Sequence, residues 1–425
     1  MNKTNKHQHG AALMLLVFIL AIAMTSYLVR TLNSASYKVD HEQKVMQNLA
    51  TAKEALIAWA VSNELHPGQF PYPDHLEVTT PIYDGKGDCG GNPLSNPILL
   101  LGQLPVYGSD GCTSPVEGLG IDAQDGYGNR LWYAVSPNLV HNYAPTLGQL
   151  SDPIINPSII NTATWLRVVD RNGATISDRV AAVIIAPGNA IGNKSRSNTA
   201  TVDNFLDEFQ IGATSYSNRN YDSFDEDFII GDTFERVDDD DATYSSPYLF
   251  NDKLVYITID ELMVALEKRV AREVVSSLNG YFSVNSYYPY AASSGGTVCV
   301  NNQLLGALPL SPCSTPDLST YLPGWFEDNE WEAFMFYAAS LNCSQPNPGC
   351  SSGTLKVGTK ENLNAVVIST GAEITTAFKV QDRVGSGLIV DYLDSVENIS
   401  INEEYDAVGT PLTNLYNDQM FIVTP

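Results

Sequence analysis

The side chains best suited to chemistry in this sequence are carboxylates in two loops. An acidic run lies within residues 222–241, and Asp84 and Asp88 lie in a glycine-rich loop before the first cysteine. Calcium prefers hard carboxylate oxygens, and the alternate spacing of Asp238 and Asp240 would let their carboxylates converge on one ion. We therefore predict these four aspartates as calcium ligands, calcium being the one cofactor that the sequence suggests. The alternative is a pair of solvated acidic loops, because neither run has the order of an EF-hand.

Short signatures of enzymatic catalysis are absent from the sequence. It contains no P-loop, G-x-S-x-G, H-E-x-x-H or G-x-G-x-x-G motif. Histidine, the usual general base, does not occur after His141. The sequence therefore predicts a protein that is not an enzyme.

The six cysteines form three pairs of near neighbours, each bracketing a loop rich in Gly, Pro, Ser and Asn. The pairs are Cys89 with Cys112, Cys299 with Cys313, and Cys343 with Cys350. This pattern predicts local disulfides formed in an oxidising compartment. Free or metal-binding thiols are the alternative, but no C-x-x-C motif is present and all histidines precede the last four cysteines.

Composition indicates a folded, strongly acidic protein. Lys and Arg total 23 against 48 Asp and Glu, so the formal net charge is −25. Such a charge repels phosphates, which argues against a nucleic-acid partner. A hydrophobic fraction of 44% and a length of 425 residues permit more than one domain with its own core.

The element that must position the rest of the chain is an uncharged apolar segment from Ala11 to Val29, preceded by Lys3 and Lys6. Its length approaches the roughly 20 residues that a transmembrane helix needs. Basic residues ahead of it favour a cytoplasmic N-terminus. We therefore expect a single-pass inner-membrane protein whose later residues are exported. The alternative is a secretory signal cleaved after Ala23, which would release a periplasmic enzyme or binding protein.

A long helix is expected to continue beyond the membrane. No Gly or Pro occurs between Ala11 and His66, so one helix can extend to about residue 66. Beyond the apolar segment, apolar residues step by three and four along one face, which predicts that this part of the helix packs on a domain. These residues are Val45, Leu49, Ala52, Leu56 and Trp59.

The short leader ending in Gly10, followed by Ala11-Ala12-Leu13-Met14-Leu15 and the long helix, resembles the class III signal of type IV pilins and type II secretion pseudopilins. The resemblance implies cleavage after Gly10 by a prepilin peptidase and methylation of Ala11. It also implies that the N-terminal helix binds other pilins or pseudopilins, after a stage in the inner membrane.

Leu15 departs from the family pattern, because most pilins carry Glu at that mature position to neutralise a neighbouring N-terminal ammonium. Large minor subunits at the filament tip resemble this chain in lacking that Glu. The resemblance therefore implies a tip subunit at the cell surface, one that primes assembly or acts in adhesion. The alternatives are a repeated shaft subunit and a protein that never polymerises.

The second half of the sequence repeats the first in the same order, which predicts an internal duplication. A helix followed by Tyr-Pro, a cysteine-bounded loop, two strands and two Asp-containing segments occur in both halves. The last two segments match as 202–207 with 390–394, and as 250–258 with 416–424. The second helix is expected over Ile259 to Tyr281.

Together these patterns predict an α+β protein with a long N-terminal transmembrane and amphipathic helix. Two tandem pilin-like domains should follow, each a helix packed on a small antiparallel sheet. The predicted boundaries are a leader over 1–10, a transmembrane helix over 11–30, a first domain over 31–258 and a second over 259–425. The predicted function is a minor pilin or pseudopilin at or near the tip of a type IV pilus or a type II secretion-like filament.

Overall fold

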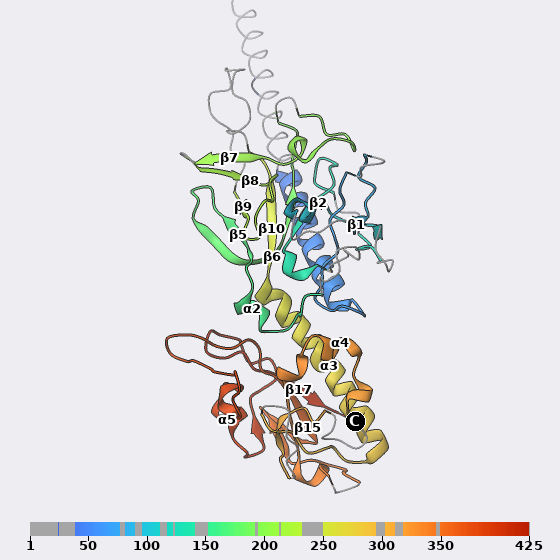
Figure 1. The fold of residues 1–425 in the computed structure, drawn as a ribbon, viewed down its shortest axis with the longest axis vertical. Helices are drawn as coiled ribbons and strands as arrows, with labels where there is room; N and C mark the ends of the chain where they lie inside the picture. The colour runs from blue at the N-terminus through green and yellow to red at the C-terminus, as the bar shows by residue number, and fades with distance from the viewer. Residues whose placement is uncertain are drawn as a thin grey trace, which may run out of the picture.

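The computed structural model has mixed helix and strand content and two lobes stacked along its long axis (Figure 1). It describes residues 24, 39–76, 81–89, 96–110, 117–121, 124–140, 152–191, 194–211, 214–231, 250–294, 302–310, 318–345 and 349–424.

The first lobe is organised around a six-stranded sheet, here called the first sheet. Its central strand, β6 (Thr175–Ala186), is buried from Val180 onward and lies among antiparallel neighbours. A continuous apolar run of this kind is typical of a strand covered on both faces. The other members are β2 (Leu101–Gln103), β4 (Trp132–Val135), β5 (Leu166–Val169), β9 (Asp227–Ile229) and β10 (Lys253–Thr258).

The second lobe contains a four-stranded antiparallel sheet, here called the second sheet. Its order is β11 (Leu305–Ala307), β12 (Met335–Ala339), β15 (Ala365–Ser369) and β17 (Gln419–Val423). The path β2-β4-β6-β10 in the first sheet runs through its strands in the same chain order. The two sheets therefore share a core of four strands with matching connectivity.

Smaller elements surround the two sheets. The short parallel pair is β1 (Gly87–Asp88) with β3 (Ser109–Asp110), and the hairpin is β7 (Glu208–Ile211) with β8 (Thr214–Ser217). A three-stranded sheet joins β13 (Leu355–Val357), β14 (Lys360–Leu363) and β16 (Glu404–Tyr405). The short helices are α2 (Ile159–Thr162), α4 (Gly324–Asp328) and α5 (Val396–Ile399).

The described N-terminal helix covers residues 39–62. Its buried stripe follows the predicted spacing, except that Ala60 takes the last buried position and Trp59 is only partly covered. The indole Nε1 of Trp59 instead donates to the Glu117 carbonyl at 2.8 Å. The buried residues are Val45, Leu49, Ala52, Leu56 and Ala60.

Helix α3 (Ile259–Asn285) links the two lobes, and it starts at the residue that the sequence indicates. The Thr258 side chain caps it by accepting from the Glu261 backbone N–H at 3.2 Å. Leu262 and Leu266 are fully buried, and the helix packs on β6 and β10 of the first sheet and on β15 and β17 of the second. One apolar cluster consequently contains residues from both lobes.

The fold class predicted from the sequence is wrong. In place of a small antiparallel sheet in the first lobe, the structure has a mixed six-stranded first sheet, in which β5 and β9 pair in parallel. Additional small sheets, two of them with parallel pairs, occur in both lobes. The strand β6 has 12 residues because it continues back through Thr175 to Arg179, where polar residues hide the strand signal. This extension provides the edge on which β5 and then β9 are added.

The predicted transmembrane helix and the single-pass inner-membrane location, with a final position at the cell surface or filament tip, also require correction. None of the described helices has the length and apolar character needed to cross a bilayer. Both long helices carry charged residues along their length, among them Lys53, Glu54, Lys268 and Arg269. The proposed span over residues 11–30 lies outside the described residues, apart from Met24.

Candidate functional site

The first predicted calcium pair is tied into local contacts. Asp84 lies 3.4 Å from the Lys86 ammonium, and Asp88 accepts a hydrogen bond from the His75 backbone N–H at 2.5 Å. Asp74, which was not among the predicted ligands, lies close enough to feel the charges of both and accepts from the Gly85 backbone N–H at 2.7 Å. Burial, assisted by the charges of Asp88 and Asp84, raises the pKa of Asp74 to about 8.

The structure does not assemble the predicted metal centre in the part of the chain that it describes. Asp238 and Asp240 lie outside the described residues. Within them, no group of three or more His, Cys, Asp or Glu side chains could hold a metal ion. Asp227, within the acidic run, instead forms a bidentate pair with Arg167, with both N–O distances at 2.6 Å.

One predicted disulfide is confirmed and the processing residues stay predictions. Cys343 and Cys350 are bonded, with their Cα atoms 4.8 Å apart. Cys89 is also disulfide-bonded, whereas its predicted partner and the remaining pair lie outside the described residues. Those cysteines are Cys112, Cys299 and Cys313. The processing and assembly positions Gly10, Ala11 and Leu15, and the alternative site after Ala23, also lie outside them.

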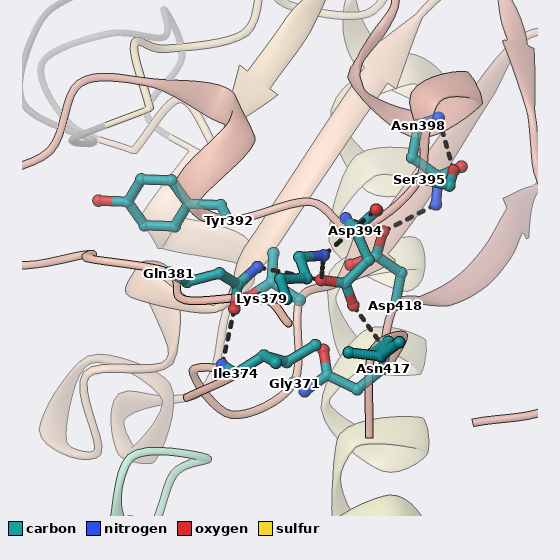
Figure 2. Close-up of polar contacts among 12 residues, drawn as sticks. Gly371, Ile374, Lys379, Gln381, Tyr392, Asp394, Ser395, Asn398, Asn417 and Asp418 are labelled. Atoms are coloured by element: carbon teal, nitrogen blue, oxygen red, sulfur yellow. Dashed lines mark hydrogen bonds and ion pairs between the residues drawn. The ribbon is translucent and has the colours of Figure 1, made fainter. Parts of the chain in front are cut away.

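The most unusual chemistry of the described chain lies beside the second sheet, in a buried group that we call the second network. It consists of Lys379, Asp394, Asn398 and Asp418 (Figure 2). The Lys379 ammonium donates to Oδ1 of Asp394 and to its backbone carbonyl, the latter at 3.2 Å. Oδ2 of Asp418 accepts from the Asp394 backbone N–H and from the Asn398 amide, both at 2.8 Å. Two carboxyl groups and one ammonium therefore share a single buried site.

A corresponding group lies beside the first sheet, and we call it the first network. It consists of Lys194, Asp207, Asn218 and Asp252. The Lys194 ammonium donates to Oδ1 of Asp207, and the Asp207 backbone N–H donates to Oδ2 of Asp252 at 2.8 Å. The Asn218 amide donates to the same oxygen of Asp252 at 3.2 Å. Each member thus has the same role as its counterpart in the second network.

The two networks are positioned by matching backbone features. Asp252 and Asp418 directly precede β10 and β17, the strands that occupy the same place in the two sheets. The residue before each of them, Asn251 or Asn417, donates its backbone N–H to Oδ2 of the first carboxylate, at 2.8 and 2.5 Å respectively. The carboxylates therefore anchor a loop onto the start of a core strand.

Glycines allow the close approach of these loops. Gly188 and Gly371 follow β6 and β15 with φ of 66° and 58°, a region that favours glycine. A Cβ on Gly371 would lie 2.6 Å from the Asn417 side chain, and one on Gly188 would lie 3.0 Å from the Asn251 carbonyl oxygen. These turns bring the end of one strand against the loop before the next.

An arginine side chain also holds each of these glycine turns through hydrogen bonds. Arg383 donates to the carbonyls of Thr370 and Gly371 at 2.9 and 2.7 Å. Arg196 donates likewise to those of Pro187, at 2.9 Å, and Gly188. Burial lowers the pKa of both guanidinium groups. The carbonyl contacts compensate for the water that these buried cations lose.

Burial also controls the protonation of the second carboxyl in each network. The pKa of Asp418 is raised to about 8, first by burial and then by the charge of Asp394. The pKa of Asp252 is raised well above its usual value for the same two reasons, burial and the charge of Asp207. Burial therefore favours the neutral carboxylic acid form of both Asp252 and Asp418.

Lys379 belongs to a short stretch that we call the 378–384 segment. Its side chains are inverted relative to an ordinary surface loop, with apolar groups facing solvent and polar groups facing the core. Phe378 and Val384 are 89% and 90% exposed, and Val380 is also exposed. Lys379 and Gln381 point inward, and the Gln381 amide donates to Oδ1 of Asp394 at 3.0 Å. Ionic and amide groups therefore hold the segment from inside while its apolar groups face solvent.

The corresponding segment of the first lobe faces solvent with polar residues. Lys194 and Arg196 alternate along this segment with three exposed polar residues, Ser195, Ser197 and Thr199. Its lysine and arginine make the same inner contacts as those of the second lobe, but its outer surface differs. The apolar outer surface is therefore specific to the second lobe and is not needed to hold the loop.

The sequence carries a signal for both networks, although neither network was predicted. The two Asn-Asp pairs, 251–252 and 417–418, stand at the same place in the repeated segments, as do Asp207 and Asp394. An acidic residue retained at the same place in two halves, immediately before an apolar strand, indicates a buried partner. Comparison with protein-family models, curated proteins and solved structures finds no match.

Proposed function

We propose that this chain is a non-enzymatic structural subunit of the minor pilin or pseudopilin kind, which binds a partner through the exposed apolar residues of its second lobe. The observation that carries the proposal is the inverted 378–384 segment. Exposing large apolar groups while burying a lysine does not stabilise a solvated loop. It does provide apolar area that a bound partner can cover.

Further exposed apolar residues follow that segment along the chain, up to and just past α5. Together with those of the segment they are Phe378, Val380, Val384, Leu388, Val396 and Ile401, and we call this set the apolar surface. The chain as a whole carries a net charge of −25, so an apolar region provides an association surface that does not depend on a basic partner. Other subunits of a filament are partners that fit this chemistry.

The described carboxyl groups with raised pKa support a structural role over an enzymatic one. Asp252, Asp418 and Glu267 are buried and hydrogen-bonded to groups of the chain itself. General acid–base catalysis needs such a group within reach of a substrate atom. Their contacts instead hold loops and strands of this chain together.

The mature N-terminus is the first test. Purified protein from the native host should begin at Ala11 with a methylated amino group if a prepilin peptidase cuts after Gly10. A mature chain that begins at Met24 would overturn the proposal and support a released periplasmic enzyme or binding protein. Quantitative mass spectrometry of purified filaments then counts the subunit. Its absence from purified filaments would also contradict the proposal.

The apolar surface has a separate test with a matched control. The double substitution Phe378→Ser with Val384→Ser should reduce incorporation into filaments, because it removes the two most exposed apolar groups. The control is Val284→Ser, since Val284 is 66% exposed on α3, away from this surface. Equal incorporation of wild type and both variants would show that the apolar surface binds no filament partner.

A further inference from the structure

The two networks bring together the groups required to form an amide bond between side chains. An amine nucleophile, a carboxyl electrophile and a second, protonated carboxyl meet in each of them. In the second network these are Lys379, Asp394 and Asp418 (Figure 2). In the first they are Lys194, Asp207 and Asp252.

We propose that Lys379 and Asp394 join in an intramolecular isopeptide bond promoted by Asp418, and that Lys194 and Asp207 join likewise with Asp252. In each pair the lysine nitrogen already forms a hydrogen bond to an oxygen of the carboxyl group that it would attack. The reacting groups therefore need little further ordering. No cofactor or external reagent is required.

The reacting groups are largely shielded from water. The side chains of Asp394 and Asp207 are 0% and 1% exposed, and those of Lys379 and Lys194 are 22% and 14% exposed. A buried ammonium–carboxylate pair loses hydration on both ions. Transfer of one proton from the ammonium to the carboxylate gives a neutral amine beside a carboxylic acid, and this pair can condense.

Hydrogen-bond donors polarise the carboxyl that is attacked. Asp394 accepts from the Gln381 amide at Oδ1 and from the Asn417 backbone N–H at Oδ2, at 3.0 and 2.5 Å. Donors placed in this way stabilise the negative charge that develops on oxygen as the amine adds to carbon. In the first network the Asn251 backbone N–H performs the same role on Asp207.

The second carboxyl is suited to move the protons. Oδ2 of Asp418 is held by two N–H donors, whereas its Oδ1 is buried and has no hydrogen-bond partner among the described residues. Oδ1 of Asp252 is likewise buried and has no hydrogen-bond partner among the described residues. Burial favours the protonated form of both groups, and the free oxygen then carries a hydroxyl that can donate to the tetrahedral intermediate.

The reaction balances without an oxidant or reductant. The Lys379 nitrogen forms a bond to Cγ of Asp394, and the bond from Cγ to one carboxyl oxygen breaks. That oxygen leaves as water after Asp418 delivers a proton to it, and Asp418 recovers a proton from the nitrogen. The products are one neutral amide and one water molecule, and Asp418 is unchanged.

Mass spectrometry of the denatured, reduced full chain tests the proposal. Wild type should be lighter than its mature sequence by the mass of two water molecules. A protease digest should contain a branched peptide joining Lys379 to Asp394 and a second joining Lys194 to Asp207. A folded wild-type chain with the full sequence mass and no branched peptide would overturn the proposal and leave both sites as buried ion pairs.

Variants separate the two sites and the promoting acid. Lys379→Arg should restore the mass of one water molecule, and adding Lys194→Arg should restore the second. Asp418→Asn keeps the shape but removes the proton donor, so the branched peptide at Lys379 should be lost while the one at Lys194 stays. Retention of the bond in folded Asp418→Asn would refute the role of that acid.

A solvated ion pair provides the control. Lys356 lies 3.5 Å from Glu404 with both side chains well exposed, at 40% and 54%. It has the same pair of functional groups without burial or a second carboxyl. Lys356→Arg should leave the number of missing water molecules at two, and no branched peptide should contain Lys356.

Discussion

The loops held by the first and second networks are anchored by a similar buried lysine–aspartate pair, but their exteriors are opposite in character. Lys194 with Asp207 and Lys379 with Asp394 make the same buried contact in the two lobes. Outside, the first loop presents serine and threonine, and the second presents phenylalanine and valine. The difference shows that the network maintains the loop while its outer residues are free to acquire another role.

The helices above the two sheets differ as well. The helix over 39–62 buries an apolar stripe alone, whereas α3 also buries Glu267. That carboxylate accepts from the Ser369 hydroxyl and the Gln419 amide at 2.8 and 2.7 Å, so it bonds to two strands of the second sheet. The second sheet is therefore attached to its helix through a buried carboxylate, whereas the helix over 39–62 reaches the first sheet through the half-buried Lys53, whose ammonium donates to the Tyr256 carbonyl of β10 at 2.9 Å.

The largest expected effect concerns the two lysines. Lys194→Met and Lys379→Met each leave a buried carboxylate without its cation and prevent the proposed bond, so each should lower the free energy of unfolding by about 3–5 kcal/mol. Lys194→Met should cost more, because Asp394 retains the Gln381 donor and none of the described residues supplies an equivalent amide donor to Asp207. Denaturant unfolding of the two variants measures this. Equal losses would show that Gln381 gives no compensation.

The disulfide of the second lobe should have the next largest effect. Replacing Cys343 and Cys350 together by serine opens a loop with a sequence separation of 7 residues. Loop-closure entropy predicts a loss of about 2–3 kcal/mol. Thermal unfolding of the variant and of wild type under oxidising conditions measures it. An unchanged midpoint would mean that the loop is held without the bond.

Glu267 should make the second lobe more sensitive to pH. Burial raises its pKa from 4.5 to about 7, so the folded state binds a proton that the unfolded state releases between these values. Its contribution therefore falls as pH rises from about 4.5 to about 7, by at most about 1.4 kcal/mol per pH unit. Glu267→Gln should flatten the dependence of stability on pH in that range. An identical slope in the variant would contradict the shift.

The smallest effect on stability is expected from the outer residues. Ser195→Val with Ser197→Val, and Phe378→Ser with Val384→Ser, should each change the unfolding free energy by less than about 0.5 kcal/mol, because these side chains are exposed. Binding of a fluorescent dye specific for apolar surfaces should rise in the first variant and fall in the second. Unchanged dye binding in both would show that the two loops present similar surfaces.

Local patterns predicted helices and strands but not the full sheets. Leu262, Leu266, Val270 and Val274 repeat at helical spacing, and all four are buried on α3. The polar start of β6 and the short strands β5 and β9 have no such signal, because their stability comes from pairing with distant segments. The larger mixed sheet therefore could not be inferred from periodicity.

The candidate site escaped prediction for a related reason. Dense acidic runs are conspicuous in the sequence, yet the unusual carboxyl groups are isolated in sequence and lie next to apolar strands. Asp207 and Asp252 meet only because a turn at Gly188 places their loops together. Their burial, which sets their chemistry, is a property of the assembled core.

Helix α3 has a mechanical consequence. It has 27 residues, about 40 Å of helix, and packs on strands of both sheets. The two lobes therefore have no slack connector between them, and tension applied at residue 39 is transmitted through the first sheet and this rod to the second. The apolar surface around Phe378 consequently keeps its orientation relative to the first lobe when force is applied. A partner bound there would be pulled in one fixed direction.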